Sequence, residues 1–454
     1  MSAVVQQIRF ADIDRWDPPS TIAPTMFRYP TATLGEIADV RLGLQVPRKG
    51  SRPVGVKRPY LRAMNVRRGH VDTADVRTMY LSESQARELT LHDGDLLFVE
   101  GSGSITEVGR AARWDGSVDD CVHQNSVVRA RVTAEDLDLD YLVTWFNSRA
   151  GNAYIRSMAT TTSGLFHIGA NKLTGMTVPL PPTDVQHTLV TGVAAARQAA
   201  LDTEMAAHAH RRAAWAQFEQ GTSHAAAAVA DTGKAAIVSF AALDRWDVAT
   251  SIETLTSPYP LHPLADLGDI RLGTQIPRKG SDAPGTHTRY LRAANVQKGR
   301  VDLSDVRTMA ATPATVERLR LRDGDLLVVE GNSEEEVGRA AVWRGDDDLV
   351  IIQNSIIRVQ LDRTLVDPDF VAAWLNSDAG RAYVRRRATT TSGSLWHIGA
   401  AKLAGAPIPV PPLPDQRAFV ATLNAALATA DELLRQAEEH RERAETLVDD
   451  LLVL

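Results

Sequence analysis

The chain contains one segment twice. Residues 41–50 read RLGLQVPRKG and residues 271–280 read RLGTQIPRKG, an offset of 230 residues (271 − 41) in a chain of 454. The same offset relates YLRAMNV to YLRAANV and DGDLLFVEG to DGDLLVVEG. Solenoid repeats have periods of about 20–50 residues. The sequence therefore predicts two copies of a whole domain, and any function must account for two similar heads.

Composition places the chain among globular proteins. Hydrophobic residues make up 44% and charged residues 23% of the sequence, and no apolar stretch approaches the roughly 20 residues of a membrane span. The N-terminal residues lack the pattern of a secretion signal, so we expect a cytoplasmic protein. The single cysteine, Cys121, has Val350 as its counterpart. We expect a buried small side chain there rather than a nucleophile, with no disulfide and no cysteine-based metal site.

The net charge of −6 is concentrated in one segment. Between Asp431 and Asp450 there are eight acidic residues and three arginines, a balance of −5. The remainder of the chain is nearly neutral, so a local basic face for an anionic partner is compatible with the overall charge.

Hydrophobic periodicity predicts an α+β fold with two mixed domains, each followed by a long helix. Short runs rich in β-branched and aromatic residues indicate strands, and DYLVTWFNS and its partner indicate helices. Each domain ends at a proline-rich exit, TVPLPP or PIPVPP. The predicted boundaries are 1–182 for the first domain, 183–221 for its helix, 222–238 for a linker, 239–412 for the second domain and 413–454 for its helix.

Both long helices carry an apolar seam of coiled-coil spacing. In the second helix the seam comprises Leu423, Leu427, Ala430, Leu434, Ala437, Ala444, Val448 and Leu451. In the first helix it comprises Val193, Ala200, Ala207, Ala214 and Phe218. Because small residues let helices approach closely, we expect the two helices to pair with each other, a local bundle being the alternative.

A search for catalytic motifs finds no phosphate loop, no HExxH, no GxSxG and no CxxC. Asp17-Pro18-Pro19-Ser20 is superficially similar to an amino-methyltransferase motif, but the aromatic residue is absent and the second copy reads DVAT. His123 is replaced by Ile352 in the second copy, whereas His167 and His397 are each followed by Ile-Gly-Ala. No carboxylate partner recurs near these histidines, so contact with structure or with a nucleic-acid backbone is favoured over general-base catalysis. We expect no catalytic residue, cofactor or metal.

Polar and basic residues retained in both copies form the candidate DNA-binding set. Arginine and lysine suit phosphates and guanine edges, asparagine can read adenine, and hydroxyls suit either. The set comprises Arg48, Lys49, Arg62, Asn65, Arg67, Arg68, Thr160, Thr161, Thr162, Ser163, His167 and Lys172 in the first copy. In the second copy it comprises Arg278, Lys279, Arg292, Asn295, Lys298, Thr389, Thr390, Thr391, Ser392, His397 and Lys402.

In this order, these segments resemble the specificity subunit of type I restriction-modification systems. The resembling elements are the loop after RLG, YLR-x-x-NV, GDLL-x-VEG, the QNS strand, the FNS or LNS helix, and the proline-rich exits with Gln186 or Gln416. The resemblance implies two target recognition domains that each read half of a bipartite DNA site. It also implies two antiparallel helices that space the domains and dock two methyltransferase subunits, with restriction subunits as further partners. The subunit itself would be non-catalytic.

Other classes of protein are compatible with parts of the sequence. A stand-alone adenine methyltransferase would need a cofactor loop, and a tandem module for a non-DNA ligand would not require paired helices. A specificity subunit of another DNA-modifying defence complex is the nearest alternative. Because the two heads are similar, we expect a nearly palindromic, interrupted target.

Overall fold

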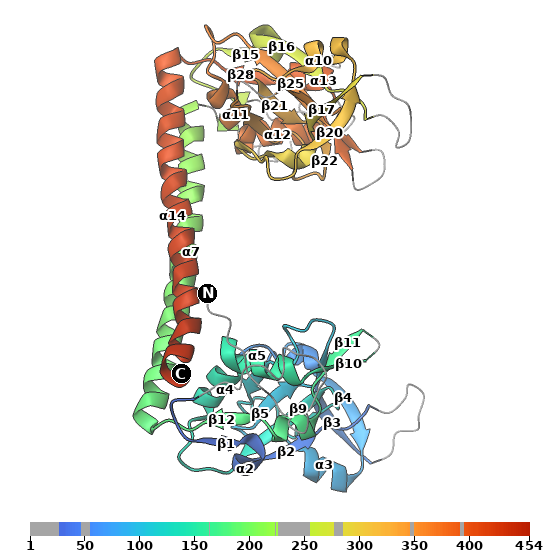
Figure 1. The fold of residues 1–454 in the computed structure, drawn as a ribbon. Coiled ribbons are helices and arrows are strands. Elements are labelled where there is room, and N and C mark those ends of the chain that lie inside the picture. Colours follow the sequence, from blue (N-terminus) through green and yellow to red (C-terminus); the bar gives the residue numbers. More distant parts are fainter. Residues whose placement is uncertain are drawn as a thin grey trace, which may run out of the picture. The chain divides into compact units, whose positions relative to one another are not determined.

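The computed structural model describes most of the chain in two compact units. Unit 1 contains residues 1–204 and 434–454, and unit 2 contains residues 205–433 (Figure 1). The described residues are 27–46, 55–162, 164–222, 224–225, 255–276, 285–345, 349–390 and 395–454.

The core of unit 1 is a four-stranded antiparallel sheet with the order β2-β9-β5-β7. Its strands are β2 (Ala38–Leu42), β5 (Leu96–Val99), β7 (Ala111–Arg113) and β9 (Val127–Val132). Every side chain of β5 is buried, as a run of four apolar residues predicts for a strand covered on both faces. Leu96 and Phe98 pack with the helices on one face, and Leu97 and Val99 pack with Trp114 on the other.

A second sheet covers that other face. Its order is β4-β3-β8, with β3 (Val56–Leu61) antiparallel to β4 (Arg77–Leu81) and parallel to β8 (Val122–His123). Helix α3 (Glu83–Leu89) follows β4 and begins with a capping box in which Ser82 and Gln85 satisfy each other's main-chain N–H groups.

Two helices, α4 (Leu139–Asn147) and α5 (Arg149–Met158), cover the first face of the main sheet. Ser148 separates them, ending α4 and accepting a hydrogen bond from Gly151 N as the N-cap of α5. The amide of Asn147 bonds both main-chain groups of Ala111 in β7. The FNS segment is therefore retained because it ties the helices to the sheet.

The smaller elements of unit 1 lie around this core. They are β1 (Thr31–Thr33), α2 (Leu34–Ile37), η2 (Ala63–Asn65), β6 (Gly101–Ser102), β10 (Thr160–Thr162), β11 (Leu165–His167), α6 (Ala170–Thr174) and β12 (Thr177–Pro179).

Unit 2 repeats the arrangement, with sheets β16-β25-β21-β23, β20-β17-β24, β22-β27-β26 and β15-β28 and a hairpin β18-β19. Its strands are β15 (Leu261–Pro263), β16 (Gly268–Leu272), β17 (Thr286–Leu291), β18 (Val296–Gln297), β19 (Arg300–Val301), β20 (Arg307–Ala311), β21 (Leu326–Val329), β22 (Gly331–Asn332), β23 (Ala340–Val342), β24 (Val350–Ile352), β25 (Ile356–Leu361), β26 (Thr389–Thr390), β27 (Trp396–His397) and β28 (Pro407–Pro409). Its helices are α9 (Leu264–Leu267), η4 (Ala293–Asn295), α10 (Pro313–Leu319), α11 (Pro368–Asn376), α12 (Asp378–Arg387) and α13 (Ala400–Ala404). A short pair, β13 (His224–Ala225) and β14 (Leu255–Thr256), precedes it.

Two helices of 40 residues each, α7 (Thr183–Thr222) and α14 (Leu413–Leu452), follow the two domains. In unit 1, Gly192 lies against Leu447 and Glu204 pairs with Arg441. In unit 2, Arg211 pairs with Asp431 and Gly221 lies against Phe419.

In both units the residue number on α14 falls as the number on α7 rises, so the two helices run antiparallel. The predicted α+β fold with paired antiparallel helices is confirmed.

The seam predictions hold closely. On α7, Val193 and the alanines at 200, 207 and 214 are all buried, as is Phe218. On α14, Leu423, the alanines at 430, 437 and 444, and Val448 are buried. The predicted seam leucines Leu427 and Leu434 are only half-buried. The last seam position is wrong by one residue, because Leu452 is fully buried and Leu451 is only half-buried. Leu452 is four residues after Val448, so both side chains lie on the same face of the helix. That face packs against the domain core of unit 1 at the end of α14.

A buried glutamine connects each domain to its helix. In unit 1, Gln186 accepts a hydrogen bond from Asp138 N at 2.9 Å and donates to the carbonyls of Asp136 and Pro181. In unit 2, Gln416 repeats these bonds with its own domain. The glutamine after each proline-rich exit thus fixes the start of the long helix against its domain.

Two side chains considered for chemistry prove to be core residues. Cys121 is fully buried, and burial raises the pKa of its thiol to about 12, as expected for a small hydrophobic residue. His123 is also fully buried; burial lowers its pKa to about 4, and its Nδ1 atom lies 3.0 Å from the carbonyl of Val127.

Candidate nucleic-acid interface

Each unit places a histidine–glutamate pair on its small three-stranded sheet. In unit 1, β11 pairs with β10 and β6, and the Nδ1 atom of His167 lies 3.1 Å from Oε2 of Glu100. In unit 2, β27 pairs with β26 and β22, and His397 lies 3.0 Å from Glu330. The prediction that no carboxylate partner recurs near these histidines is wrong. Each glutamate is 67 residues away in the sequence, and strand pairing brings it to the ring.

The pair fixes which ring nitrogen is available. An ionised carboxylate only accepts hydrogen bonds, so Nδ1 of a neutral imidazole carries the proton and Nε2 is left as an acceptor. About one third of each histidine side chain is exposed, 32% for His167 and 31% for His397. The arrangement presents an oriented imidazole edge to an external partner.

A glycine lies under each ring. A Cβ atom on Gly101 would lie 2.8 Å from Nδ1 of His167, and one on Gly331 would lie 2.7 Å from Nδ1 of His397. Any other residue would push the imidazole away from its glutamate. The glycine of each VEG segment is therefore required by the histidine across the sheet.

The hydroxyl run lies on the neighbouring strand. Thr160 and Thr161 in β10, and Thr389 and Thr390 in β26, are exposed beside the histidine strand. Thr162 ends β10 opposite Leu165. The candidates Ser163, Thr391 and Ser392 lie outside the described residues.

The asparagines present in both copies belong to the fold. Asn65 is 3% exposed; its Oδ1 accepts from Arg62 N, and its Nδ2 donates to the carbonyls of Asp72 and Asp75. Asn295 makes the same three bonds in unit 2. Because both amide hydrogens are committed to carbonyls, neither side chain is oriented to read a base. We therefore remove both asparagines from the candidate interface.

The arginines before them are also committed. Arg62 donates from Nη2 to the main-chain oxygen and Oδ2 of Asp75, at 2.8 and 2.7 Å. Arg292 makes the equivalent contacts with Asp305. Their side chains are mostly buried, 13% and 20% exposed. These arginines stabilise the YLR segment, and we therefore remove them from the candidate interface as well.

The basic turn after each asparagine differs between units. Arg67 is about half exposed and lies 3.8 Å from Asp72, while Arg68 donates to the carbonyl of Thr106. In unit 2, Nζ of Lys298 lies 4.5 Å from the centroid of the Trp215 ring on α7. Burial lowers the pKa of this lysine. Lys298 therefore contacts α7 although it is exposed at the surface, and Arg67 is exposed as well.

The remaining lysines close helix ends. Nζ of Lys172 donates to the carbonyl of Met158, the last residue of α5, and Nζ of Lys402 donates to the carbonyl of Arg387, the last of α12. Both positions suit a cation at a helix C-terminus. The loop candidates Arg48, Lys49, Arg278 and Lys279 lie outside the described residues.

The sequence reasoning missed the two glutamates. Glu100 and Glu330 stand in the VEG segment of both copies, which was assigned to a buried strand. The available signal was an acidic residue that both copies keep at the end of an apolar strand. A carboxylate kept in both repeats beside a glycine indicates a polar partner there.

Solved structures match almost the whole chain. The HsdS subunit from Thermoanaerobacter tengcongensis aligns over 96% of this chain and 98% of its own, with a TM-score of 0.51 and 15% identity. A chain from a structure on complex assembly and conformational transition of the type I R-M system aligns over 94% and 98%, with a TM-score of 0.63 and 16% identity. These likenesses show the fold.

Sequence matches are shorter. The specificity subunit of the type I restriction enzyme EcoKI, from Escherichia coli (strain K12), is 36% identical over 141 residues, 30% of this chain and 29% of that protein. The StySPI specificity subunit, from Salmonella potsdam, is 23% identical over 169 residues, 37% of this chain and 36% of that protein. The alignments thus span about one third of the curated relatives. No family model matches the chain.

Fold and sequence together define the class. The chain resembles specificity subunits of type I restriction-modification systems, over part of its length in sequence and over nearly all of it in fold. The resemblance expected from the repeated motifs is confirmed. In the described part of the chain no helix is long and apolar enough to cross a membrane.

Proposed function

We propose that this chain is the DNA-sequence specificity subunit of a type I restriction-modification complex. The observation that carries the proposal is the 36% identity with the EcoKI specificity subunit. The two-unit fold and the antiparallel helices support it over the remainder of the chain. Each unit would read one half of a bipartite DNA site.

The proposed contact surface in each unit is the small sheet. Exposed threonine hydroxyls donate and accept, and the oriented imidazole accepts at Nε2, so a base edge or a sugar-phosphate group can be bound there. In unit 1, Thr160, Thr161 and His167 form this surface, and the exposed Arg67, between β3 and β4, stays a candidate phosphate contact. In unit 2, Thr389, Thr390 and His397 form it. The loops with Arg48, Lys49, Arg278 and Lys279 stay in the proposal as phosphate contacts.

The proposed target is nearly palindromic and interrupted. Both units carry the same histidine–glutamate pair and the same threonines, and antiparallel helices have two-fold symmetry, as duplex DNA does. Two similar heads that followed such a two-fold axis would read similar sequences on opposite strands. Differences such as Leu44 against Thr274 would make the two halves imperfect repeats.

The proposed partners are two methyltransferase subunits, docked on the helices, with restriction subunits joining the complex. The chain itself would transfer no methyl group. Co-expression with the neighbouring methyltransferase, followed by mass measurement, tests this proposal. The expected species contains two methyltransferase subunits per chain, and methyl transfer occurs only in the complex. Methyl transfer by the isolated chain, or a 1:1 complex at excess methyltransferase, would contradict it.

A further inference from the structure

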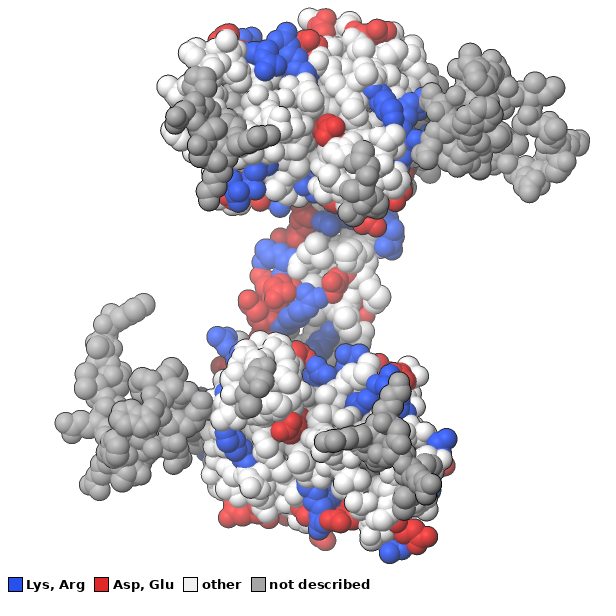
Figure 2. All heavy atoms as spheres, turned by 90° about the vertical axis from the view of Figure 1, so that its right-hand side faces the viewer, with Lys and Arg blue, Asp and Glu red and all other residues white. Residues whose placement is uncertain are grey.

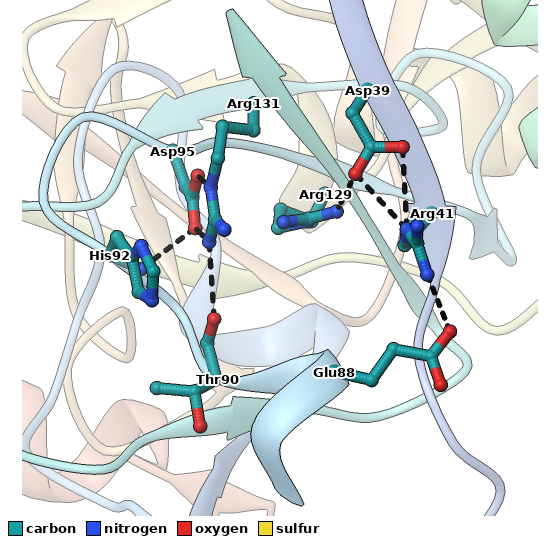
Figure 3. Close-up of polar contacts among 8 residues, drawn as sticks. All are labelled: Asp39, Arg41, Glu88, Thr90, His92, Asp95, Arg129 and Arg131. Carbon is teal, nitrogen blue, oxygen red and sulfur yellow. Dashed lines mark hydrogen bonds and ion pairs between the residues drawn. The ribbon is translucent and has the colours of Figure 1, made fainter. Parts of the chain in front are cut away.

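The edge of the main sheet in unit 1 carries a charge-balanced network (Figure 3). Oδ2 of Asp39 accepts hydrogen bonds from Nη2 of Arg129 at 2.6 Å and Nε of Arg41 at 3.0 Å. Arg41 also pairs with Glu88 at 2.5 Å. Arg129 is only 2% exposed. Its buried charge is compensated by the direct contact with the carboxylate of Asp39.

The other half of the network is equally paired. Arg131 binds the buried carboxylate of Asp95 with both ends of its guanidinium, at 2.7 and 2.8 Å, and donates to the carbonyl of Thr90 at 3.1 Å. The main-chain N–H of His92 donates to the same carboxylate at 2.8 Å (Figure 3). With three arginines and three acidic residues, the eight positions are neutral.

Unit 2 replaces this balance by an excess of positive charge. Four of the eight positions keep their residue type, while Glu88 becomes Arg318, Thr90 becomes Arg320, His92 becomes Arg322 and Arg131 becomes Gln360. Five arginines and two aspartates now occupy the eight positions, a net charge of three positive. These replacements surround a hollow of about 470 Å³ lined by one acidic residue, Glu317, and by Arg271, Ala314, Arg318, Arg320, Arg322, Arg358 and Gln360.

The hollow lies between α10, β16 and β25, at the end of unit 2 away from β22 (Figure 1). Lys and Arg side chains lie on the surface at this end together with Asp and Glu side chains (Figure 2). The hollow is therefore distinct from the small sheet that carries His397.

One arginine at the base of the hollow is buried without a direct anionic partner. Arg358 is 2% exposed, and its hydrogen bonds all go to neutral acceptors: the carbonyls of Arg320 at 2.7 Å and Arg318 at 3.0 Å, and Oε1 of Gln360 at 3.3 Å. The nearest carboxylate, Asp325, is 4.0 Å from its Nε. The counterpart Arg129 has Asp39 at 2.6 Å. Burial lowers the pKa of Arg358, which reflects the same lack of compensation.

The rim supplies further donors. Within the described ranges, the guanidinium groups of Arg318 and Arg320 make no hydrogen bond or ion pair, and Arg322 lies 3.9 Å from Glu317. Asp325, the carboxylate below them, is already bonded by Arg322 N and Gln360 Nε2. Two of the arginines that line the hollow, Arg318 and Arg320, thus have no acceptor of their own in the described part of the chain, whereas Arg271 is paired with Asp269 at 2.5 Å.

We propose that unit 2 binds a phosphate-bearing anion in this basic hollow and that unit 1 does not. Guanidinium groups bind phosphate oxygens bidentately, and an anion next to Arg358 supplies the compensation that Asp39 gives Arg129. The volume accommodates a diphosphate group. The site is independent of the proposed recognition of DNA by the small sheets, because it rests on other residues.

Calorimetric titration of the full chain with inorganic pyrophosphate tests the site. The wild-type chain is expected to bind one equivalent. A four-residue variant carries the unit 1 residues at these positions: Arg318→Glu, Arg320→Thr, Arg322→His and Gln360→Arg. It is expected to bind pyrophosphate at least about tenfold more weakly, which corresponds to a loss of about 1.4 kcal/mol of binding free energy. Unit 1 shows that this residue set is compatible with the fold. Arg300→Ala, an exposed arginine outside the hollow, serves as the matched control and should leave binding unchanged.

The reciprocal variant gives a gain rather than a loss. Glu88→Arg with Thr90→Arg, His92→Arg and Arg131→Gln is expected to create a second pyrophosphate site in unit 1. Competition by a short duplex would assign the natural ligand to nucleic-acid phosphates, and competition by ATP alone would assign it to a nucleotide; both support a phosphate site. Absence of pyrophosphate binding by the wild-type chain, or equal binding by the four-residue variant of unit 2, would overturn the proposal.

Discussion

His167 and Glu100 lie 3.1 Å apart across a small sheet, although 67 residues separate them in the sequence. The second copy repeats the contact. Both copies also share a buried asparagine. The histidine–glutamate pair differs from that asparagine because it is partly exposed rather than in the core. The pair is therefore central to the proposed contact with DNA.

Gly101→Ala is expected to weaken DNA binding by the assembled complex about tenfold, the loss of one oriented contact. The added Cβ would lie 2.8 Å from Nδ1 of His167 and must displace the ring. Gly103→Ala is the control, since its Cβ meets only Leu165 at 4.0 Å. Fluorescence anisotropy with the cognate duplex measures both. Equal affinity for the two variants would remove His167 from the interface.

Asn65→Ala is expected to destabilise the chain by about 1–3 kcal/mol, because buried main-chain groups lose their partners. Sequence preference should be unchanged, since the amide does not face a ligand. Thermal or denaturant unfolding measures the free energy of unfolding. Arg67→Ala, at an exposed position, is the control and should change that free energy by about 0.5 kcal/mol or less. A folded Asn65→Ala variant with wild-type stability and relaxed specificity at one base would restore this residue to the interface.

Acid stability should depend on Asp39. Burial acts to raise its pKa, but hydrogen bonds from Arg129 and Arg41 outweigh burial, so its pKa lies below the ordinary value. A carboxylate with a depressed folded-state pKa stabilises the fold above its unfolded pKa, about 3.9, and this contribution is lost as the pH falls through the folded value.

Asp39→Asn is therefore expected to lower stability at neutral pH and to flatten the loss of stability below about pH 4. Denaturant unfolding as a function of pH measures the effect. Asp119→Asn, an exposed aspartate without an ion pair in the described part of the chain, should follow the wild type. Parallel pH profiles for wild type and Asp39→Asn would exclude this pairing in solution.

Ala444→Leu tests the close approach of the helices. Ala444 is 4% exposed and packs with Leu189 and Val193 of α7 in the core of unit 1. Extra methylene groups in a filled core typically cost about 1–3 kcal/mol. Glu442→Leu, at an exposed position of the same turn, should have little effect on unfolding. If Ala444→Leu is as stable as its control, the seam is not tightly packed.

The internal repeat predicted the two-domain architecture because its length corresponds to a whole domain with its following helix. Strands such as LLFV and the alanine seams were identified correctly, since their periodicity is set by burial on one or both faces. The end of the α14 seam was misplaced because the final turn packs on the domain rather than on α7 alone.

The candidate site was harder to predict. Retention in both copies marks residues that the fold needs as well as residues that a ligand needs. Asn65 and Lys172 are retained for main-chain hydrogen bonds, whereas Glu100 was overlooked because its partner is distant in the sequence. The basic hollow of unit 2 was invisible to a search for retained residues, since it arises from differences between the copies.

Genome-wide mapping of modified adenines, in the host with and without this gene, tests the central claim most directly. The predicted result is an interrupted motif with two related, inverted half-sites that is modified only when the gene is present. An unchanged modification pattern after deletion would contradict the assignment as a specificity subunit. Two half-sites without an inverted-repeat relation would contradict the link between similar heads and a nearly palindromic target.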